Sequence, residues 1–139
     1  MNKPIPRRIH GLLDYAYVTA VAHLPEMAGF HKNKNAVRFF RALSGVVFTT
    51  TALTRAEWGA VKLLPYKKHL VFDAVVSTVA IAAPWLLGFS GNKKATLTSV
   101  AVGMFGYAVV ALSEPENLPV TKDAYEETKE KVIASESAK

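Results

Sequence analysis

Two pairs of ionisable side chains stand four residues apart within apolar sequence: His10 with Asp14, and His69 with Asp73. Residues four apart lie on one face of a helix, so each histidine can reach its own aspartate. Imidazole and carboxylate groups at this spacing can hydrogen-bond, ligate a metal, or relay protons or ions. Two histidines can also serve as axial ligands of a haem. Which chemistry applies depends on the elements that position the two pairs.

The segments around these pairs are apolar enough to enter a lipid bilayer. Residues 69–89 contain Asp73 as their only formal charge, and residues 95–113 contain none. Twenty helical residues span about 30 Å, which is the thickness of the hydrocarbon layer. Half of the 139 residues are apolar although the last 26 are strongly polar. The sequence therefore predicts an integral membrane protein.

The chain repeats itself at an offset of 59 residues, the distance from His10 to His69, without a gap. One offset that aligns proline, histidine, aspartate, glycine and phenylalanine together indicates an internal duplication. The aligned residues include Pro6 with Pro65, Asp14 with Asp73, Pro25 with Pro84, Gly29-Phe30 with Gly88-Phe89, and Asn33-Lys34 with Asn92-Lys93.

Each repeat is expected to form two helices joined by a short basic turn, over about 10–29 and 36–54, and again over 69–88 and 95–113. Two spans return the chain to its starting side, so both repeats share one orientation. The predicted fold is all-α: a four-transmembrane-helix bundle built from two tandem helical hairpins in parallel orientation. The membrane domain is predicted over 1–113, with repeat one at about 6–54, repeat two at about 65–113, a polar tail over 114–139 and a short helix within it over about 122–134.

One sequence box carries a family resemblance. The stretch "APWLLGF", residues 83–89, resembles the Ser-Pro-Trp box of the SPW-repeat family of small bacterial membrane proteins. The stretch "LTRAEWGAVKLLPYKKH", residues 53–69, is similar to the linker of those proteins. The resemblance covers roughly residues 6–113 and implies two transmembrane helices per repeat. The chain departs from it at Ala83, which replaces the serine, and in the first repeat, where Leu24-Pro25-Glu26 has no tryptophan.

The same box and its counterpart in the first repeat form a second set of candidate residues, which we interpret as a helix kink and repeat motif. The two prolines lie late in their predicted helices, where they kink or end them. The set comprises Pro25, Gly29, Phe30, Pro84, Trp85, Gly88 and Phe89.

The duplication places both His–Asp pairs at one depth, so we expect His10, Asp14, His69 and Asp73 to cluster and to face the bundle interior. A polar group left against lipid costs roughly several kcal/mol, whereas a polar group that faces the interior can hydrogen-bond to the other His–Asp pair. Interhelical hydrogen bonding is the favoured interpretation. There are three alternatives. The first is a metal site of these four residues, whose ligand types suit zinc; the others are a proton or ion relay and haem ligation. No haem attachment motif is present, and no cofactor is expected.

The remaining sequence features argue against an enzyme, because no nucleophile–base pair, phosphate loop or cofactor fingerprint is present. The chain has no cysteine, which excludes disulfides and thiolate metal sites. Its net charge of +6 lies mostly in short loops beside apolar segments, as expected for topogenic charge rather than nucleic-acid binding. We predict a structural, accessory or interaction role in the membrane. The alternative is a minimal carrier or an ion- or metal-binding protein that uses the two His–Asp pairs.

The expected surroundings are the lipid bilayer and either another membrane protein or a second copy of the chain. The predicted location is the bacterial inner membrane, with both termini on one side and Trp58, Tyr66 and Trp85 in the interfacial aromatic belts. A bias of eight to six in lysine and arginine favours the cytoplasm for the termini. The eight are Lys3, Arg7, Arg8, Arg55, Lys62, Lys67, Lys68 and Lys122, and the six are Lys32, Lys34, Arg38, Arg41, Lys93 and Lys94.

Overall fold

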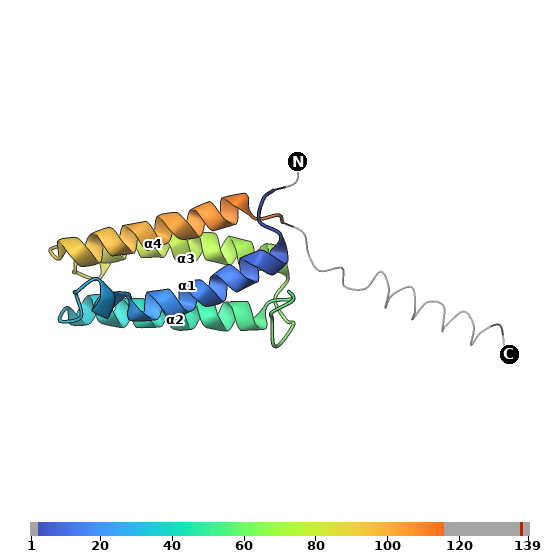
Figure 1. Ribbon diagram of the computed structural model, residues 1–139, viewed down its shortest axis with the longest axis horizontal. Helices are drawn as coiled ribbons and strands as arrows, with labels where there is room; N and C mark the ends of the chain where they lie inside the picture. The colour runs from blue at the N-terminus through green and yellow to red at the C-terminus, as the bar shows by residue number, and fades with distance from the viewer. Residues whose placement is uncertain (1–2, 116–136, 138–139) are drawn as a thin grey trace.

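The computed structural model describes residues 3–115 and residue 137, and within this part the chain forms four α-helices and no strand (Figure 1). The predicted all-α fold is confirmed, and each helix begins two or three residues before its expected start. The short helix predicted over 122–134 lies outside the described residues. The four helices are α1 (Arg7–Met27), α2 (Lys34–Leu53), α3 (Tyr66–Leu86) and α4 (Lys93–Leu112).

Two kinds of residue, proline and asparagine, stand at the helix starts, and each kind occurs there once in each half of the chain. Pro6 and Pro65 stand at the N-caps of α1 and α3, where a missing N–H costs nothing. Asn33 and Asn92 cap α2 and α4, and each side chain accepts a hydrogen bond from the backbone N–H three residues later, at 3.0 and 3.1 Å. The same two helices, with the same starting residues, therefore recur after 59 residues.

The far ends of α1 and α3 show what the predicted kink motif does. Gly29 and Gly88 have φ angles of 75° and 70°, the left-handed conformation that favours glycine. The N–H of the following phenylalanine donates to the carbonyl of Pro25 or Pro84, at 2.9 Å in both halves, which closes a Schellman-type end. Both prolines lie within the last turn of continuous helices. The motif therefore ends the helices, and Trp85, which is 62% exposed, points away from the core.

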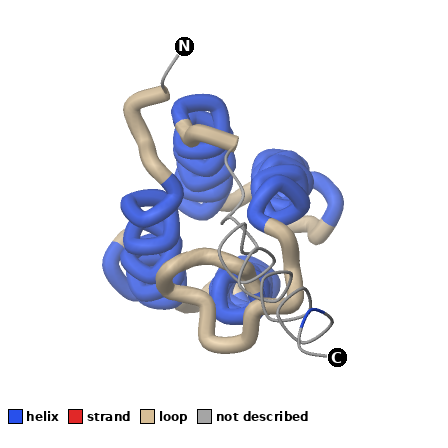
Figure 2. Tube along the Cα trace, turned by 90° about the vertical axis from the view of Figure 1, so that its right-hand side faces the viewer, coloured by secondary structure: helices blue, strands red, loops and turns tan. Residues whose placement is uncertain are grey.

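The helices form two antiparallel hairpins, α1–α2 and α3–α4, which lie side by side with their turns at the same end (Figure 1). Viewed along the bundle, the four helices surround a common axis (Figure 2). The parallel arrangement of the hairpins agrees with the prediction. At the opposite end lie the first described residues, the end of α4 and the loop over 54–65 (Figure 1).

Two isolated bridges tie this second end together at equivalent positions. Ile5 pairs with Ser113, and Leu64 pairs with Thr54. Ile5 and Leu64 directly precede the prolines that begin α1 and α3, whereas Thr54 and Ser113 cap the ends of α2 and α4. The bridges therefore fix the first turns of α1 and α3 beside the last turns of α2 and α4, which is where the His–Asp pairs lie.

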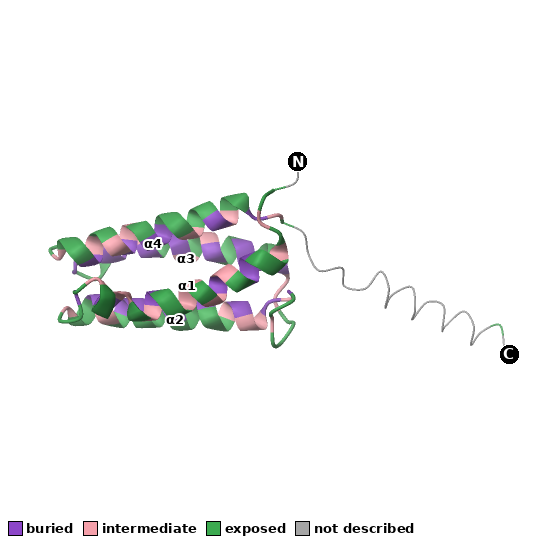
Figure 3. Ribbon diagram, viewed as in Figure 1, coloured by how far each residue is buried: buried purple, intermediate pink, exposed green. Residues whose placement is uncertain are grey.

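The bundle exposes many large apolar side chains and buries several polar ones beside its apolar core. Three of the four described helices, α2, α3 and α4, are long and apolar enough to cross a membrane, whereas α1 has the length of α3 but more polar residues. The outward faces are exposed and the facing sides are buried (Figure 3). An apolar exterior with polar groups enclosed among the helices suits lipid as the surrounding solvent. The exposed apolar residues include Leu12, Phe48, Val71, Val75, Leu97 and Met104.

Candidate functional site

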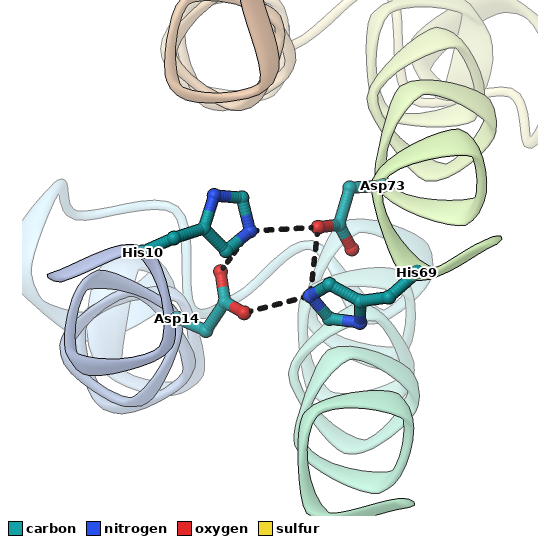
Figure 4. Close-up of side chains that lie close together, drawn as sticks. All are labelled: His10, Asp14, His69 and Asp73. Carbon is teal, nitrogen blue, oxygen red and sulfur yellow. Dashed lines mark hydrogen bonds and ion pairs between the residues drawn. The ribbon is translucent and has the colours of Figure 1, made fainter. Parts of the chain in front are cut away.

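The two His–Asp pairs meet between α1 and α3, one turn inside the bundle (Figure 4). His10 and His69 are each 1% exposed, and Asp14 and Asp73 are 7% and 9% exposed. One donor atom from each residue lies within 4.8 Å of all the others. The predicted clustering in the interior is therefore confirmed. We refer to these four residues as the His–Asp cluster.

The contacts of the cluster join the two halves as closely as they join the residues of one pair. Nε2 of His69 lies 2.9 Å from Oδ2 of Asp14, and Nε2 of His10 lies 3.1 Å from Oδ2 of Asp73. Within each pair, the corresponding distances are 3.5 Å from His10 to Asp14 and 3.0 Å from His69 to Asp73. Both Nε2 atoms therefore face both carboxylates, and the cluster joins the hairpins at their centre.

The outer nitrogens of the two histidines contact hydroxyl groups at equivalent positions. Nδ1 of His10 lies 2.6 Å from Oγ of Ser113, and Nδ1 of His69 lies 3.0 Å from Oγ1 of Thr54. Each hydroxyl donates its single proton to the carbonyl four residues earlier in its own helix, at 2.6 Å in both cases. The hydroxyl oxygen is left as the acceptor, so Nδ1 of each histidine must carry the hydrogen.

This assignment leaves both Nε2 atoms to the centre of the cluster. A bare Nε2 and a carboxylate oxygen repel each other at hydrogen-bond distance, so either a proton or a cation must lie between them. Tetrahedral zinc with ligand distances of about 2.0–2.1 Å requires neighbouring ligand atoms about 3.3 Å apart. The four His–Asp contacts of 2.9–3.5 Å are close to this value, whereas the four ligand atoms as a set lie only within 4.8 Å of one another, so the ring has to contract around a tetrahedral ion. The residues present therefore fit a small divalent metal as well as a hydrogen-bonded ring.

The two aspartates differ in their remaining contacts. The hydroxyl of Thr51 lies 3.2 Å from Oδ2 of Asp14 and 2.8 Å from the carbonyl of Val47, so its one proton is shared between these two acceptors. The residue equivalent to Thr51 in the second half is Val110, which has no hydroxyl. Oδ1 of Asp73 is buried and has no hydrogen-bond partner among the described residues. The cluster is therefore closed on the Asp14 side and incomplete on the Asp73 side.

Tyr66 corrects one of the sequence predictions. It was expected in the interfacial aromatic belt, but it is 1% exposed and belongs to the surroundings of the cluster. Its ring stacks on His69 at 6.1 Å and meets the edge of His10 at 5.5 Å. The prediction was wrong because the side chain of Tyr66, the first residue of α3, points inward. Arg7, at the equivalent position of α1, points instead to the loop between the hairpins.

A small cavity lies directly beside the cluster, with a volume of about 30 Å³. His10, Asp14 and Asp73 form part of its wall. A larger apolar groove of about 610 Å³ follows the seam between α1 and α4, and we call it the α1–α4 groove. The two spaces share three lining residues, namely Leu13, Tyr17 and Phe105. The cluster is therefore adjacent to open space on one side of the bundle.

The loop between the hairpins covers the cluster end of α1. The guanidinium of Arg7 forms two contacts with the carboxylate of Glu57, at 3.0 and 2.7 Å, and these hold the pKa of Glu57 below its usual value. The indole of Trp58 donates to the carbonyl of Arg8 at 3.0 Å. The indole ring lies against Gly11, where an added Cβ would approach within 3.1 Å. The loop is thus anchored on the turn of α1 that carries His10.

The second set of candidate residues lies at the opposite end of the bundle. Pro25 stands 15 residues after His10, which is about 22 Å along the helix. The structure therefore assigns the proline, glycine and phenylalanine residues to the helix ends and not to the cluster. Sequence reasoning missed Thr54 and Ser113 as partners of the histidines. The signal was present, because the 59-residue offset aligns a hydroxyl residue at both positions.

Comparisons of the chain with protein-family models, with curated proteins and with solved structures find no match. The function is therefore argued from the fold and from the geometry of the cluster.

Proposed function

We propose that this protein is an integral membrane protein that binds one divalent transition metal, of the zinc class, in the His–Asp cluster. The observation that carries the proposal is the convergence of two Nε2 atoms and two carboxylates while both Nδ1 hydrogens are taken by Thr54 and Ser113. Metal-bound histidines typically donate their second ring N–H to an oxygen in this way. Imidazole and carboxylate ligands together suit zinc and neighbouring divalent metals.

Charge supports the same proposal. Two aspartates buried at this depth carry two negative charges, and a divalent cation with neutral histidines balances them. A neutral site is the arrangement that costs least within a bilayer. A hydrogen-bonded ring that holds α1 to α3 is the second candidate, favoured by the contacts of 2.9–3.1 Å. The two candidates differ in what lies between the Nε2 atoms and the carboxylates, which is a cation in the metal site and protons in the hydrogen-bonded ring.

The setting of this function is also a proposal. Membrane insertion of α1 together with α2–α4 follows from its packing in the same bundle, and the exposed apolar faces provide the surface for lipid, for another membrane protein or for a second copy. An internal duplication and similarity to the SPW-repeat family account for the recurring elements. We place the protein in a bacterial inner membrane, with the end that holds Ile5 and Ser113 on the cytoplasmic side. A reporter fused to Lys139 tests this orientation.

Zinc binding by the purified protein in detergent tests the function. We expect one zinc ion per chain in equilibrium dialysis, and His10→Ala to reduce the bound zinc at least tenfold. His23→Ala is the matched control, because His23 is exposed at the other end of α1 and its ring nitrogen hydrogen-bonds the carbonyl of Thr19 in the same helix. Zinc at 100 times its Kd should stabilise the wild type by about 2.7 kcal/mol. Wild-type protein that binds no zinc, or binds it equally well without His10, leaves the hydrogen-bonded ring as the function of the cluster.

A further inference from the structure

We propose that the metal in the His–Asp cluster keeps one exchangeable coordination position on the Asp73 side, taken by water or by another small ligand. This inference rests on the proposed metal-binding function. A tetrahedral metal site that stays at its four protein ligands is typically structural, whereas a metal that accepts a fifth ligand can bind and activate a small molecule. The proposal therefore assigns the cluster a ligand beyond the metal itself.

The first observation is the unequal environment of the two aspartates. Asp14 has the hydroxyl of Thr51 at 3.2 Å, a donor that it shares with the carbonyl of Val47, whereas Val110 leaves Asp73 with no hydroxyl at the equivalent position. Oδ1 of Asp73 is buried without a partner in the part of the chain that the structure describes. A buried carboxylate oxygen without a donor destabilises the fold, because it has lost its hydration and gained no hydrogen bond in exchange. A water or a metal-bound ligand beside Asp73 supplies the missing donor.

The second observation is the cavity of about 30 Å³ that Asp73 and His10 help to line. A buried water needs about 10–15 Å³ of such space and two to four polar partners. Ser77 and Tyr17, two residues with hydroxyl groups, also line the cavity. The space therefore has the size and the polar lining for one small ligand next to the cluster.

The sequence of α4 creates this space. Gly106 lines the cavity, and a Cβ added at this glycine would lie 2.3 Å from Oγ of Ser77. The equivalent residue in the first half is Val47, which has a full side chain. The cavity also shares Leu13, Tyr17 and Phe105 with the α1–α4 groove, so a small molecule has a route from the outside of the bundle.

The test uses the full-length protein in detergent with Co²⁺ bound and azide as the probe ligand. The visible d–d bands of cobalt report its coordination, because they weaken and shift when a fifth ligand binds. We expect azide to shift the bands of the wild type in a saturable manner. Val110→Thr copies the Thr51 contact onto Asp73 and should raise the azide concentration at half-saturation at least tenfold, with one Co²⁺ per chain retained.

Val100→Thr is the matched control, because it makes the same substitution on α4 at a residue that lines neither the cavity nor the groove. It should respond to azide as the wild type does. Gly106→Ala provides a second variant in case Val110→Thr does not fold, and its methyl group should weaken the azide response by occupying the cavity. Bound cobalt with no response to azide in the wild type overturns the open position and leaves the metal site intact. Absence of cobalt binding overturns both proposals.

Discussion

The two halves of the bundle have the same elements but different interiors. Both place a histidine and an aspartate in the first turns of a helix that begins after proline, and both end that helix with glycine and phenylalanine. Beside the aspartate, however, the first half has Thr51 and the second has Val110. The repeated residues therefore determine the backbone and the position of the cluster, whereas the unmatched ones determine what can reach it.

The two helices α2 and α4, which occupy equivalent places in the hairpins, also differ in the size of the side chains that they turn inward. The α2 helix contributes three large buried side chains, namely Phe39, Phe40 and Leu43. The equivalent residues of α4 are Thr98, Ser99 and Val102, which are smaller. The α1–α4 groove lies along this smaller surface and is partly lined by Thr98 and Val102. Two hairpins with equivalent helices thus enclose a groove along the α1–α4 seam, where the side chains of the second helix are smaller.

The strongest test of this comparison removes each aspartate in turn from the metal-free protein. Asp14→Leu should lower the free energy of unfolding by about 3–5 kcal/mol, because it leaves the facing buried histidines without their carboxylate. Asp73→Leu should cost about 1 kcal/mol less, because Asp14 also binds Thr51. Asp14→Asn keeps an acceptor oxygen and should cost less than either. Unfolding with SDS in mixed micelles measures all three, and equal costs for the two leucine variants would contradict the asymmetry.

A second test uses glycines on the two second helices. Gly103 lies where α3 and α4 approach closely, and a Cβ there would be 2.6 Å from both Cγ1 of Ile81 and the backbone oxygen of Ser77. We expect Gly103→Ala to destabilise the protein by about 1–3 kcal/mol through overpacking. Gly45 on α2 has no atom within 4 Å of an added Cβ. Gly45→Ala should therefore be stabilising by about 0.5–1 kcal/mol, and the same sign for both variants would contradict the different packing of the hairpins.

The sequence was sufficient to predict the four helices, the parallel hairpins and the cluster, because each depends on residues repeated after 59 positions. His10 and His69 could be placed at one depth from this offset alone. The starts of α1 and α3 were predicted one turn late, because the apolar pattern begins at the histidines but the prolines already cap the helices at Pro6 and Pro65.

The open side of the cluster could not be predicted from the sequence. It depends on which face of α4 meets α3, and therefore on the contact of Gly106 with Ser77. The inward position of Tyr66 was missed for a similar reason, since a tyrosine at a helix start suits both the interface and the interior. Burial at these positions is a property of helix rotation, which periodicity predicts only coarsely for helices that are apolar on several faces.

A third test asks where the two halves should behave alike. Gly29 and Gly88 have nearly equal positive φ angles, and neither has a heavy atom closer than 3.4 Å to an added Cβ. Alanine at either glycine should cost about 1–2 kcal/mol, because an L-residue is strained in the left-handed conformation. Unfolding measurements should give equal costs within about 0.5 kcal/mol. A clear difference would show that the helix ends, and not only the interiors, differ between the halves.

The smallest expected effect concerns the loop that covers α1 near the cluster. Arg7 lowers the pKa of Glu57, so this carboxylate contributes stability above its usual pKa, and the contribution is lost as the pH falls through the lowered value. The pair is partly exposed, and we expect it to contribute about 0.2–1 kcal/mol. Unfolding of the wild type and of Glu57→Gln should therefore differ at pH 7 and converge once the pH has fallen below the lowered pKa of Glu57. Because both proteins share every other titrating group, the difference between them isolates this pair, and a difference that persists at low pH would show that the ion pair does not hold the loop against α1.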